Sequence, residues 1–333
     1  MTVAIIRGED DVYALLSKLI NGEDSPSDLK VLFEGWPKFK IKLVGEQFQS
    51  TITPTVMKAF LELQAGIYRS YATACYGSPN ATKLTREERE MLEMVVEVEP
   101  GSSKFNVDFG EILQNAVDGV VGKLESKHIL IALLSFSVLY FGDSAYKNYL
   151  ENRKDVRQAE IKSDEQRELL KHLTFTSKQE TERALIIATA AAQNSRVHTI
   201  SELSKDTKAE VLKRASSADK IELQGIQLTG YEAEELSKNA RQQAIEIRLD
   251  GNYRILNVDS SDPSEFKVKV RSLENGDEFV ATVQDLTVDM SHKLALQRGE
   301  WDRKSVRLTI NAKQRPSDGT IYSAKVIQAV MGQ

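Results

Sequence analysis

Alternating apolar and polar positions mark strands near both ends of the chain. Residues 39–44 place Lys40 and Lys42 on the side opposite three apolar side chains, which predicts a strand with one buried face. Apolar residues over 12–20 recur at helical spacing instead. Short segments of both kinds follow one another along this part of the chain, so residues 1–107 predict a mixed α/β domain.

The middle of the chain, residues 108–240, has helical periodicity almost throughout. From Ser126 to about Leu173 there is no proline and only one glycine, Gly142. This stretch predicts one long helix over about 126–173, with roughly 45 residues and a length of ~70 Å at about 1.5 Å per residue. We therefore expect residues 108–240 to form a helical domain.

Residues 241–333 return to short alternating segments, which are separated by turn signals such as Asp250-Gly251 and Asn275-Gly276. Five or six strands in about 90 residues predict a small antiparallel β-barrel of the SH3-like or OB-like size class. Residues 289–301 predict a helical insert. The fold class predicted for the whole chain is therefore α+β, with an N-terminal α/β domain, a central long-helix bundle and a C-terminal barrel.

One central segment, 129–142, contains no charged residue. A membrane span needs about 20 predominantly apolar residues, whereas a run of about 10–14 is more often a buried core helix. The hydrophobic segment falls between these cases, and it extends to 129–146 if Asp143 is tolerated in a water-lined interior. Lys127 and Lys147 stand at its ends, where lysines can extend to a membrane surface. Further basic residues follow Lys147, and this flank predicts that the adjoining end faces the cytoplasm.

Small and polar side chains form a stripe on one face of this segment, at i, i+4, i+7 and i+14 from His128. Such a stripe lets helices approach closely in lipid, and in several copies of the chain it could line a pore. In a soluble protein the same segment would be the core helix of a bundle or of an oligomer, so both interpretations stay open. The residues assigned to the membrane or pore helix are His128, Ala132, Ser135, Leu139, Gly142, Asp143 and Tyr146.

Composition excludes several classes of protein. The 333 residues include 44 basic and 49 acidic side chains, and 41% of them are hydrophobic. This balance excludes a disordered chain, a collagen-like chain and a multi-span membrane protein. The single cysteine, Cys75, excludes an intramolecular disulfide and a Cys-rich zinc site. The four histidines are too far apart in sequence to predict a metal site, and we expect no cofactor. No secretory signal is visible, which favours the cytoplasm.

Catalytic signals are weak. The sequence has no P-loop, no G-x-G-x-x-G, no H-E-x-x-H and no G-x-S-x-G motif. Asp250, Glu265 and Lys267 form a nuclease-like pattern, in which carboxylates and a lysine could hold Mg²⁺. The last two residues are better explained as the solvent face of a strand, opposite Phe266. We therefore expect no catalytic residues and no enzyme activity, and an unrecognised hydrolase is a third alternative.

Basic residues in the barrel region suggest a ligand. Small barrels bind single-stranded nucleic acid with such residues and with aromatics, which here would be Tyr253, Trp301 and Tyr322. Residues 241–333 carry 14 basic and 13 acidic side chains, so the region has no net basic bias, and a solvated strand face is the alternative. The candidate ligand-binding residues are Arg254, Lys267, Lys269, Arg271 and Arg307.

Several segments carry a resemblance to proteins of bacterial antiphage defence. They are Leu32-Phe-Glu-Gly-Trp-Pro37, the run 129–142, Leu308-Thr-Ile-Asn-Ala-Lys313 and Ala324-Lys-Val-Ile327. In its order of an α/β head, a short hydrophobic helix and a small β-domain, the chain resembles the channel-forming effector of the Hailong defence system. The resemblance is one of layout over nearly the whole chain and rests on no diagnostic motif, so it transfers no ligand-binding residue.

The resemblance implies an effector that opens a membrane pore and a partner nucleotidyltransferase whose short oligonucleotide products keep the pore shut. Together with the uncharged segment, it leads us to expect a non-enzymatic homo-oligomer with cytoplasmic domains at the bacterial inner membrane. A ligand or partner would gate it through different affinities for the closed and open states. The alternative is a soluble oligomeric binding protein for nucleic acid or a nucleotide, whose central helices form the oligomer core.

Overall fold

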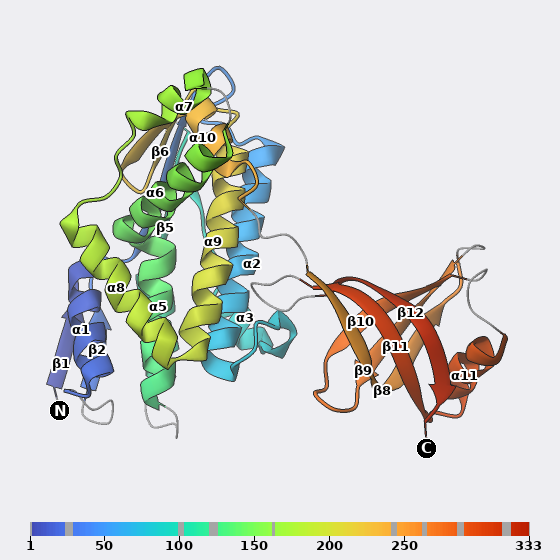
Figure 1. Cartoon of the computed structure of the whole chain (residues 1–333). Helices are drawn as coiled ribbons and strands as arrows, with labels where there is room; N and C mark the ends of the chain where they lie inside the picture. Colours follow the sequence, from blue (N-terminus) through green and yellow to red (C-terminus); the bar gives the residue numbers. More distant parts are fainter. Residues whose placement is uncertain are drawn as a thin grey trace. The chain divides into compact units, whose positions relative to one another are not determined.

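A computed structural model of the chain describes residues 2–23, 29–98, 103–119, 126–161, 164–240, 245–261, 265–284, 290–314 and 321–332. The chain forms two compact units, Met1–Arg241 and Gln242–Gln333, which are shown in Figure 1. Helices and two sheets make up the first unit, and a barrel makes up the second. The predicted α+β class is confirmed.

Two sheets organise the first unit. β1 (Thr2–Ile6) and β2 (Leu29–Phe33) pair in parallel, and the chain between them contains α1 (Glu9–Asn21). The larger sheet has the order β4-β5-β3-β6-β7, and all its neighbouring strands are antiparallel. Its strands are β3 (Lys38–Val44), β4 (Glu97–Val98), β5 (Ser103–Asp108), β6 (Lys220–Leu223) and β7 (Ile226–Thr229).

The helices of this unit often begin at the signals that the sequence provides. Thr53 caps the second helix by accepting a hydrogen bond from the Val56 N–H, and Pro54 takes the first helical position. Ser177 and Glu180 form a capping box that opens another. Beyond α1, the helices are α2 (Pro54–Tyr76), the short 3₁₀ helix Ala81–Lys83, α3 (Arg86–Met91), α4 (Gly110–Asp118), α5 (Ser126–Phe141), α6 (Asp143–Glu160), α7 (Asp164–Lys171), α8 (Lys178–Gln193), α9 (Ser195–Ala215) and α10 (Gly230–Ser237).

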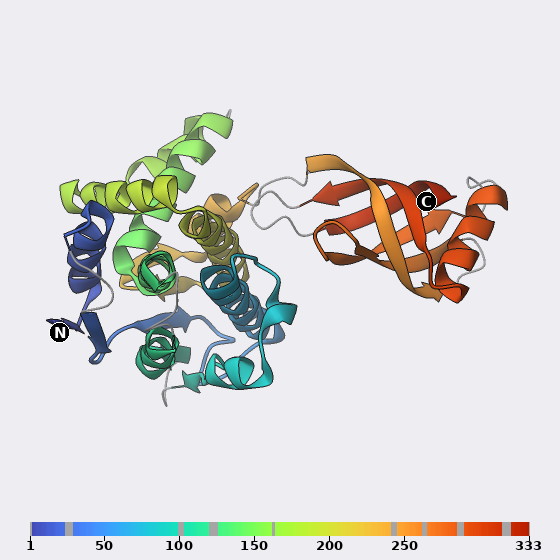
Figure 2. The same cartoon turned by 90° about the horizontal axis from the view of Figure 1, so that it is seen from below.

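The core lies between the larger sheet and a layer of helices. Helices α2, α5 and α9 run side by side, as Figures 1 and 2 show, and α2 and α9 contact the sheet. β3 turns Phe39, Ile41 and Leu43 toward these helices, and each of the three is at most 3% exposed. Phe60 of α2 meets Phe105 of β5 edge-on, with 5.3 Å between ring centroids. Alternation along β3 therefore separates a buried apolar face from an outer face that carries lysines.

The first two predicted domains share this core. β5 ends at Asp108, and β3 pairs with β5 on one side and with β6 on the other. β6 and β7 come from the segment 108–240, which the sequence suggested to be almost wholly helical. The predicted boundary between 107 and 108 thus lies inside the first unit, whereas the one near 240 coincides with its end.

The single long helix predicted over about 126–173 is wrong. The described residues of this stretch form α5, α6 and α7, and the axis bends by 66° between α5 and α6. Gly142 has an extended backbone at the bend, and Gln224 donates a 2.5 Å hydrogen bond to the Phe141 carbonyl at the end of α5. Glu9 accepts from the Ser144 N–H at the start of α6, at 3.2 Å. Groups from other elements therefore satisfy the helix ends that this break creates.

The second unit is a closed five-stranded barrel with the order β10-β12-β11-β8-β9. A helix connects its third and fourth strands in the chain, so the connectivity is that of an OB-type Greek-key barrel. The barrel is antiparallel as predicted except that β10 and β12 pair in parallel. Its elements are β8 (Ile245–Asp259), β9 (Glu265–Ser272), β10 (Glu278–Gln284), α11 (Met290–Trp301), β11 (Ser305–Gln314) and β12 (Ile321–Met331).

Two further expectations for the barrel have clear outcomes. The helical insert predicted over 289–301 is confirmed as α11 for the described residues. The turn predicted at Asp250-Gly251 is wrong, because β8 continues through it and Gly251 pairs with Leu308 of β11. Pairing of β8 with β11 along its length thus keeps Asp250-Gly251 extended, although the two residues favour a turn.

Candidate nucleic-acid interface

Three basic side chains project from β9 on the outside of the barrel. Val268 and Val270 point inward and are fully buried, so alternation places Lys267, Lys269 and Arg271 on the outer surface. The side chains of Lys269 and Arg271 are 48% and 51% exposed. The structure therefore aligns the three basic residues as the sequence predicted.

The neighbouring strand β10 adds a carboxylate and an apolar side chain to this face. Glu278 bridges two of the basic residues, with 3.0 Å to Lys269 Nζ and 2.8 Å to Arg271 Nε. The hydrogen bond from Arg271, followed by that from Lys269, lowers the pKa of Glu278. Val280 lies opposite Lys269 and is 51% exposed. The face thus combines cations that one carboxylate partly neutralises with an exposed apolar surface.

Arg254 of β8 joins this group, but Arg307 does not. Arg254 lies directly opposite Arg271 across the β8–β9 pair, and it donates a hydrogen bond to the Arg303 carbonyl. Arg307 lies on β11, opposite Asn252, on the far side of β8. Four of the five predicted ligand-binding residues therefore form one basic surface, which we call the β9 face: Arg254, Lys267, Lys269 and Arg271.

The aromatic residues expected to help are placed differently. Tyr253 is 5% exposed and packs edge-on against Phe279, with ring centroids 5.8 Å apart. Tyr253 belongs to the barrel core. The expectation that it could stack on a base is therefore wrong. Trp301 is 80% exposed at the end of α11, and the side chain of Tyr322 lies outside the described residues.

The structure separates the nuclease-like residues. Glu265 is at the first residue of β9, and Asp250 lies on β8 beyond the residue that pairs with Ser272, the last residue of β9. Glu265 and Ser272 are seven positions apart along β9, at about 3.3 Å per position. Asp250 and Glu265 therefore lie far from each other. Across the described ranges of the chain, no group of three or more His, Cys, Asp or Glu side chains is placed to hold a metal ion.

The residues assigned to a membrane or pore helix lie mainly in the core of the first unit. Ala132 and Ser135 are fully buried, Leu139 is 7% exposed and Tyr146 is 1% exposed. Among the described residues, no single helix is long and apolar enough to cross a membrane; α5 and α6 meet that criterion only as a bent pair. His128 near the start of α5 and Asp143 at the start of α6 are exposed, whereas Gly142 at the break is buried.

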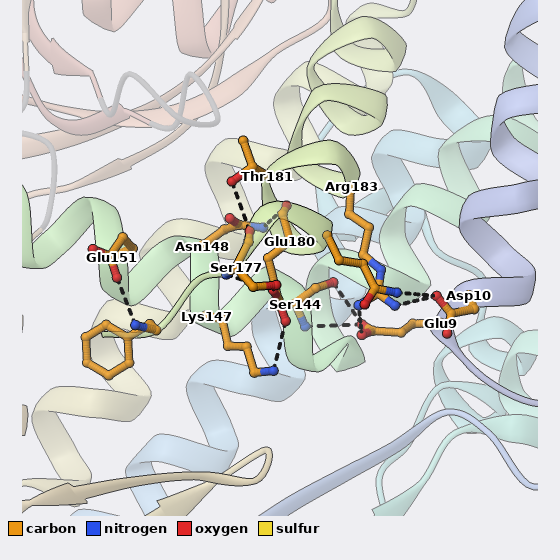
Figure 3. Close-up of polar contacts among 12 residues, drawn as sticks. Glu9, Asp10, Ser144, Lys147, Asn148, Glu151, Ser177, Glu180, Thr181 and Arg183 are labelled. Atoms are coloured by element: carbon orange, nitrogen blue, oxygen red, sulfur yellow. Dashed lines mark hydrogen bonds and ion pairs between the residues drawn. The ribbon is translucent and has the colours of Figure 1, made fainter. Parts of the chain in front are cut away.

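An ion-pair network joins the start of α6 to α1 and α8. No motif in the sequence predicted it. Figure 3 shows Arg183 of α8 between Glu9 and Asp10 of α1, with 2.6 Å from Arg183 Nη1 to Glu9 Oε1. Nearby, Lys147 donates to Glu180 at 2.9 Å. Hydrogen bonds from Ser177 and then Lys147 lower the pKa of Glu180 to about 2. The network fixes the helices around the break at Gly142.

Comparison with known proteins identifies no relative: no family model matches the sequence, and neither the curated proteins nor the solved structures include a match.

Proposed function

We propose that this chain is a non-enzymatic protein that binds single-stranded nucleic acid through the β9 face of its barrel. The observation that carries the proposal is the position of the basic row. Lys267, Lys269 and Arg271 lie on the second strand of an OB-type barrel, and the second and third strands form the surface on which such barrels bind oligonucleotides.

Electrostatics support an anionic ligand on this face. Arg254 and Arg271 are directly opposite each other, and like charges in that arrangement destabilise a sheet. A phosphate between the two guanidinium groups relieves the repulsion and accepts charge-assisted hydrogen bonds. Val280 of β10, exposed beside Lys269, offers an apolar contact for a base.

Fluorescence polarisation with a labelled single-stranded oligonucleotide tests the proposal on the full chain. If three to four phosphates are neutralised, affinity should fall about 20- to 50-fold between about 50 and about 200 mM salt. A triple variant with Lys267→Gln, Lys269→Gln and Arg271→Gln should bind weakly and should show a salt slope smaller by about two.

The matched control changes basic residues on another outer surface of the same barrel. Arg248 and its partner Asp250 are both on β8. Lys313 of β11 lies near Glu246 of β8. The double variant Arg248→Gln and Lys313→Gln should bind like the wild type. Equal losses in both variants would show general attraction to a polyanion, and absence of binding at low salt would refute the proposal.

A membrane pore is a second candidate function, because α5 carries no charged residue beyond Lys127 and because α5 and α6 together have the length and composition of a bent span. In the structure, Leu134 at the middle of α5 is fully buried in the core. A pore therefore requires a second conformation, in which α5 leaves its neighbours α2 and α9.

Membrane fractionation of the expressed chain, with carbonate and detergent washes, tests this second candidate. Release by detergent alone, followed by conductance in liposomes, would support a pore. Recovery of the folded chain without detergent, together with no conductance, would refute it. The oligonucleotide measurement is independent of both results, because the β9 face belongs to the other unit.

A further inference from the structure

The outer face of the five-stranded sheet carries a lysine cluster that the β9 face does not involve. Lys40 and Lys42 project from β3 on the side opposite the core, and Lys104 projects from β5 directly opposite Lys42. Like charges directly opposite each other are destabilising in a sheet. Residues 1–240 carry 30 basic and 36 acidic side chains, so this cluster is a local exception in an acidic unit.

These three lysines line a pocket of about 510 Å³. That volume lies within the range of about 300–1,000 Å³ that is usual for small-molecule sites. Lys38 also lines the pocket, and it pairs with Asp108 at 3.4 Å. The other walls come from the start of α1, the end of α5, the start of α6, Glu222 of β6 and the β6–β7 turn at Gln224. Strands and helices that are distant in sequence therefore converge on one concave site.

An aromatic side chain stands at the same pocket. Trp36 lines it and stacks on Phe33, with ring centroids 6.4 Å apart and planes inclined by 18°. The indole is thus held on one side by Phe33 and is only partly buried. Aromatic faces of this kind stack on nucleobases in complexes with single-stranded nucleic acid.

The carboxylates at the pocket differ in their hydrogen bonds and ion pairs. Glu9 and Asp10 are both held by Arg183, and Glu9 also accepts from the Ser144 hydroxyl at 2.9 Å (Figure 3). Asp143 lines the pocket as well, and burial followed by the nearby charge of Glu9 raises its pKa. Glu222 of β6 also lines the pocket, directly opposite Lys42, so the site presents carboxylates beside its lysines.

Two N–H groups just before α1 are already engaged. Asp11 accepts hydrogen bonds from the Arg7 and Gly8 N–H groups, at 2.8 and 3.1 Å. The cationic groups that line the pocket are the lysines of the sheet.

We propose that the pocket binds a nucleoside polyphosphate, with its phosphates on Lys40, Lys42 and Lys104 and its base against Trp36. The site lies in the first unit and is independent of the nucleic-acid binding proposed for the barrel.

Tryptophan fluorescence gives a direct test, because Trp36 and Trp301 are the two tryptophans of the chain. In a Trp301→Phe background, titration with ATP should change the emission of Trp36 in a saturable way. Inorganic triphosphate should compete with ATP, and adenosine alone should bind more weakly. The double variant Lys40→Gln and Lys42→Gln should weaken ATP binding by about a hundredfold or more, since it removes two charge-assisted contacts to phosphate.

Lys220→Gln is the matched control, because Lys220 lies on β6 of the same sheet but does not line this pocket. It should leave ATP affinity unchanged, and so should the triple variant of the β9 face. No saturable change with ATP, or an equal loss in Lys220→Gln, would overturn the proposal. Equal affinity for ATP and triphosphate would overturn the role of Trp36. Loss of oligonucleotide binding in the barrel variant alone bears only on the function proposed above.

Discussion

Lys208 of α9 is a buried cation, and replacing it should stabilise the protein. Its relative exposure is 3%, and its Nζ lies 5.0 Å from the ring centroid of Tyr146 and 6.0 Å from that of Tyr149. No salt bridge to Lys208 is found among the residues that the structure describes. Burial, followed by the nearby charge of Lys205, lowers the pKa of Lys208 to about 7.

The size of the effect follows from that pKa. A lysine that titrates at 10.5 in the unfolded chain and at about 7 in the folded chain costs about 4–5 kcal/mol at pH 7, at 1.36 kcal/mol per unit. The two tyrosine faces return about 0.5–2 kcal/mol through cation–π attraction. Lys208→Met keeps the volume and removes the charge, so we expect it to raise the free energy of unfolding by about 2–4 kcal/mol at pH 7.

The pH dependence gives the sharper test. Between about pH 7 and 10.5 the unfolded chain binds a proton at Lys208 that the folded chain does not, so wild-type stability should rise with pH by up to about 1.4 kcal/mol per unit. Burial raises the pKa of Tyr146 and Tyr149, and above about pH 10 these groups act in the opposite direction. Measurements should therefore stop near pH 9.5.

Urea unfolding of the first unit can be followed through Trp36 in a Trp301→Phe background, at several pH values between about 7.5 and 9.5. The Lys208→Met variant should lose most of the pH slope. Lys213→Met changes an exposed lysine on the same helix and should behave like the wild type. A wild-type stability that does not change with pH, together with no gain in Lys208→Met, would refute the reasoning.

Three other predictions concern the first unit, and each is tested by urea unfolding. Leu134→Arg should destabilise it by more than about 3 kcal/mol, because Leu134 is fully buried and the substitution places a charge in an apolar core; normal stability would contradict the placement of α5 in the core. Gly66→Ala should cost about 1–3 kcal/mol, since a Cβ there would meet the Thr207 hydroxyl, and Thr207→Ala should recover part of the loss. The carboxylate of Glu180 should contribute at most about 3 kcal/mol, present above about pH 4.5 and lost as pH falls towards 2, and Glu180→Gln should remove this acid dependence.

Local signals in the sequence were sufficient for many elements. The pair Thr53-Pro54 marks the start of α2, and the alternation of β3 gives both its buried face and its row of lysines. The row on β9 follows from the same period of two. Each of these features depends on residues within one or two turns or on one strand, so a short window contains the information.

Features set by distant residues could not be predicted in this way. The break at Gly142 is stabilised by Glu9 and by Gln224, which are far from it in sequence. The parallel pairing of β10 with β12 depends on how the barrel closes. Alternation along β8 did not show that Tyr253 faces the core. It separates the side chains into two faces, but which face is buried depends on how the barrel closes.

The pocket in the first unit illustrates the same limit. Lys40 and Lys42 were visible in the sequence as the polar side of a strand, with no sign of a concavity. Their neighbour Lys104 comes from β5, and Trp36 is held in place by Phe33. Only the assembled sheet and the start of α1 convert a solvated strand face into a site.

The burial of α5 also decides what a membrane-inserted state would require. Its apolar side chains are removed from water equally well by lipid and by the protein core, so the hydrophobic effect of α5 alone favours neither state. Departure of α5 would break the hydrogen bond between Ser70 and Tyr140, at 2.9 Å, and would expose the surfaces of α2 and α9 that now contact α5. Those surfaces cost free energy unless lipid or a second copy of the chain covers them. A pore is therefore compatible with this fold only if insertion of α5 is coupled to assembly, and an inserted monomer would contradict this argument.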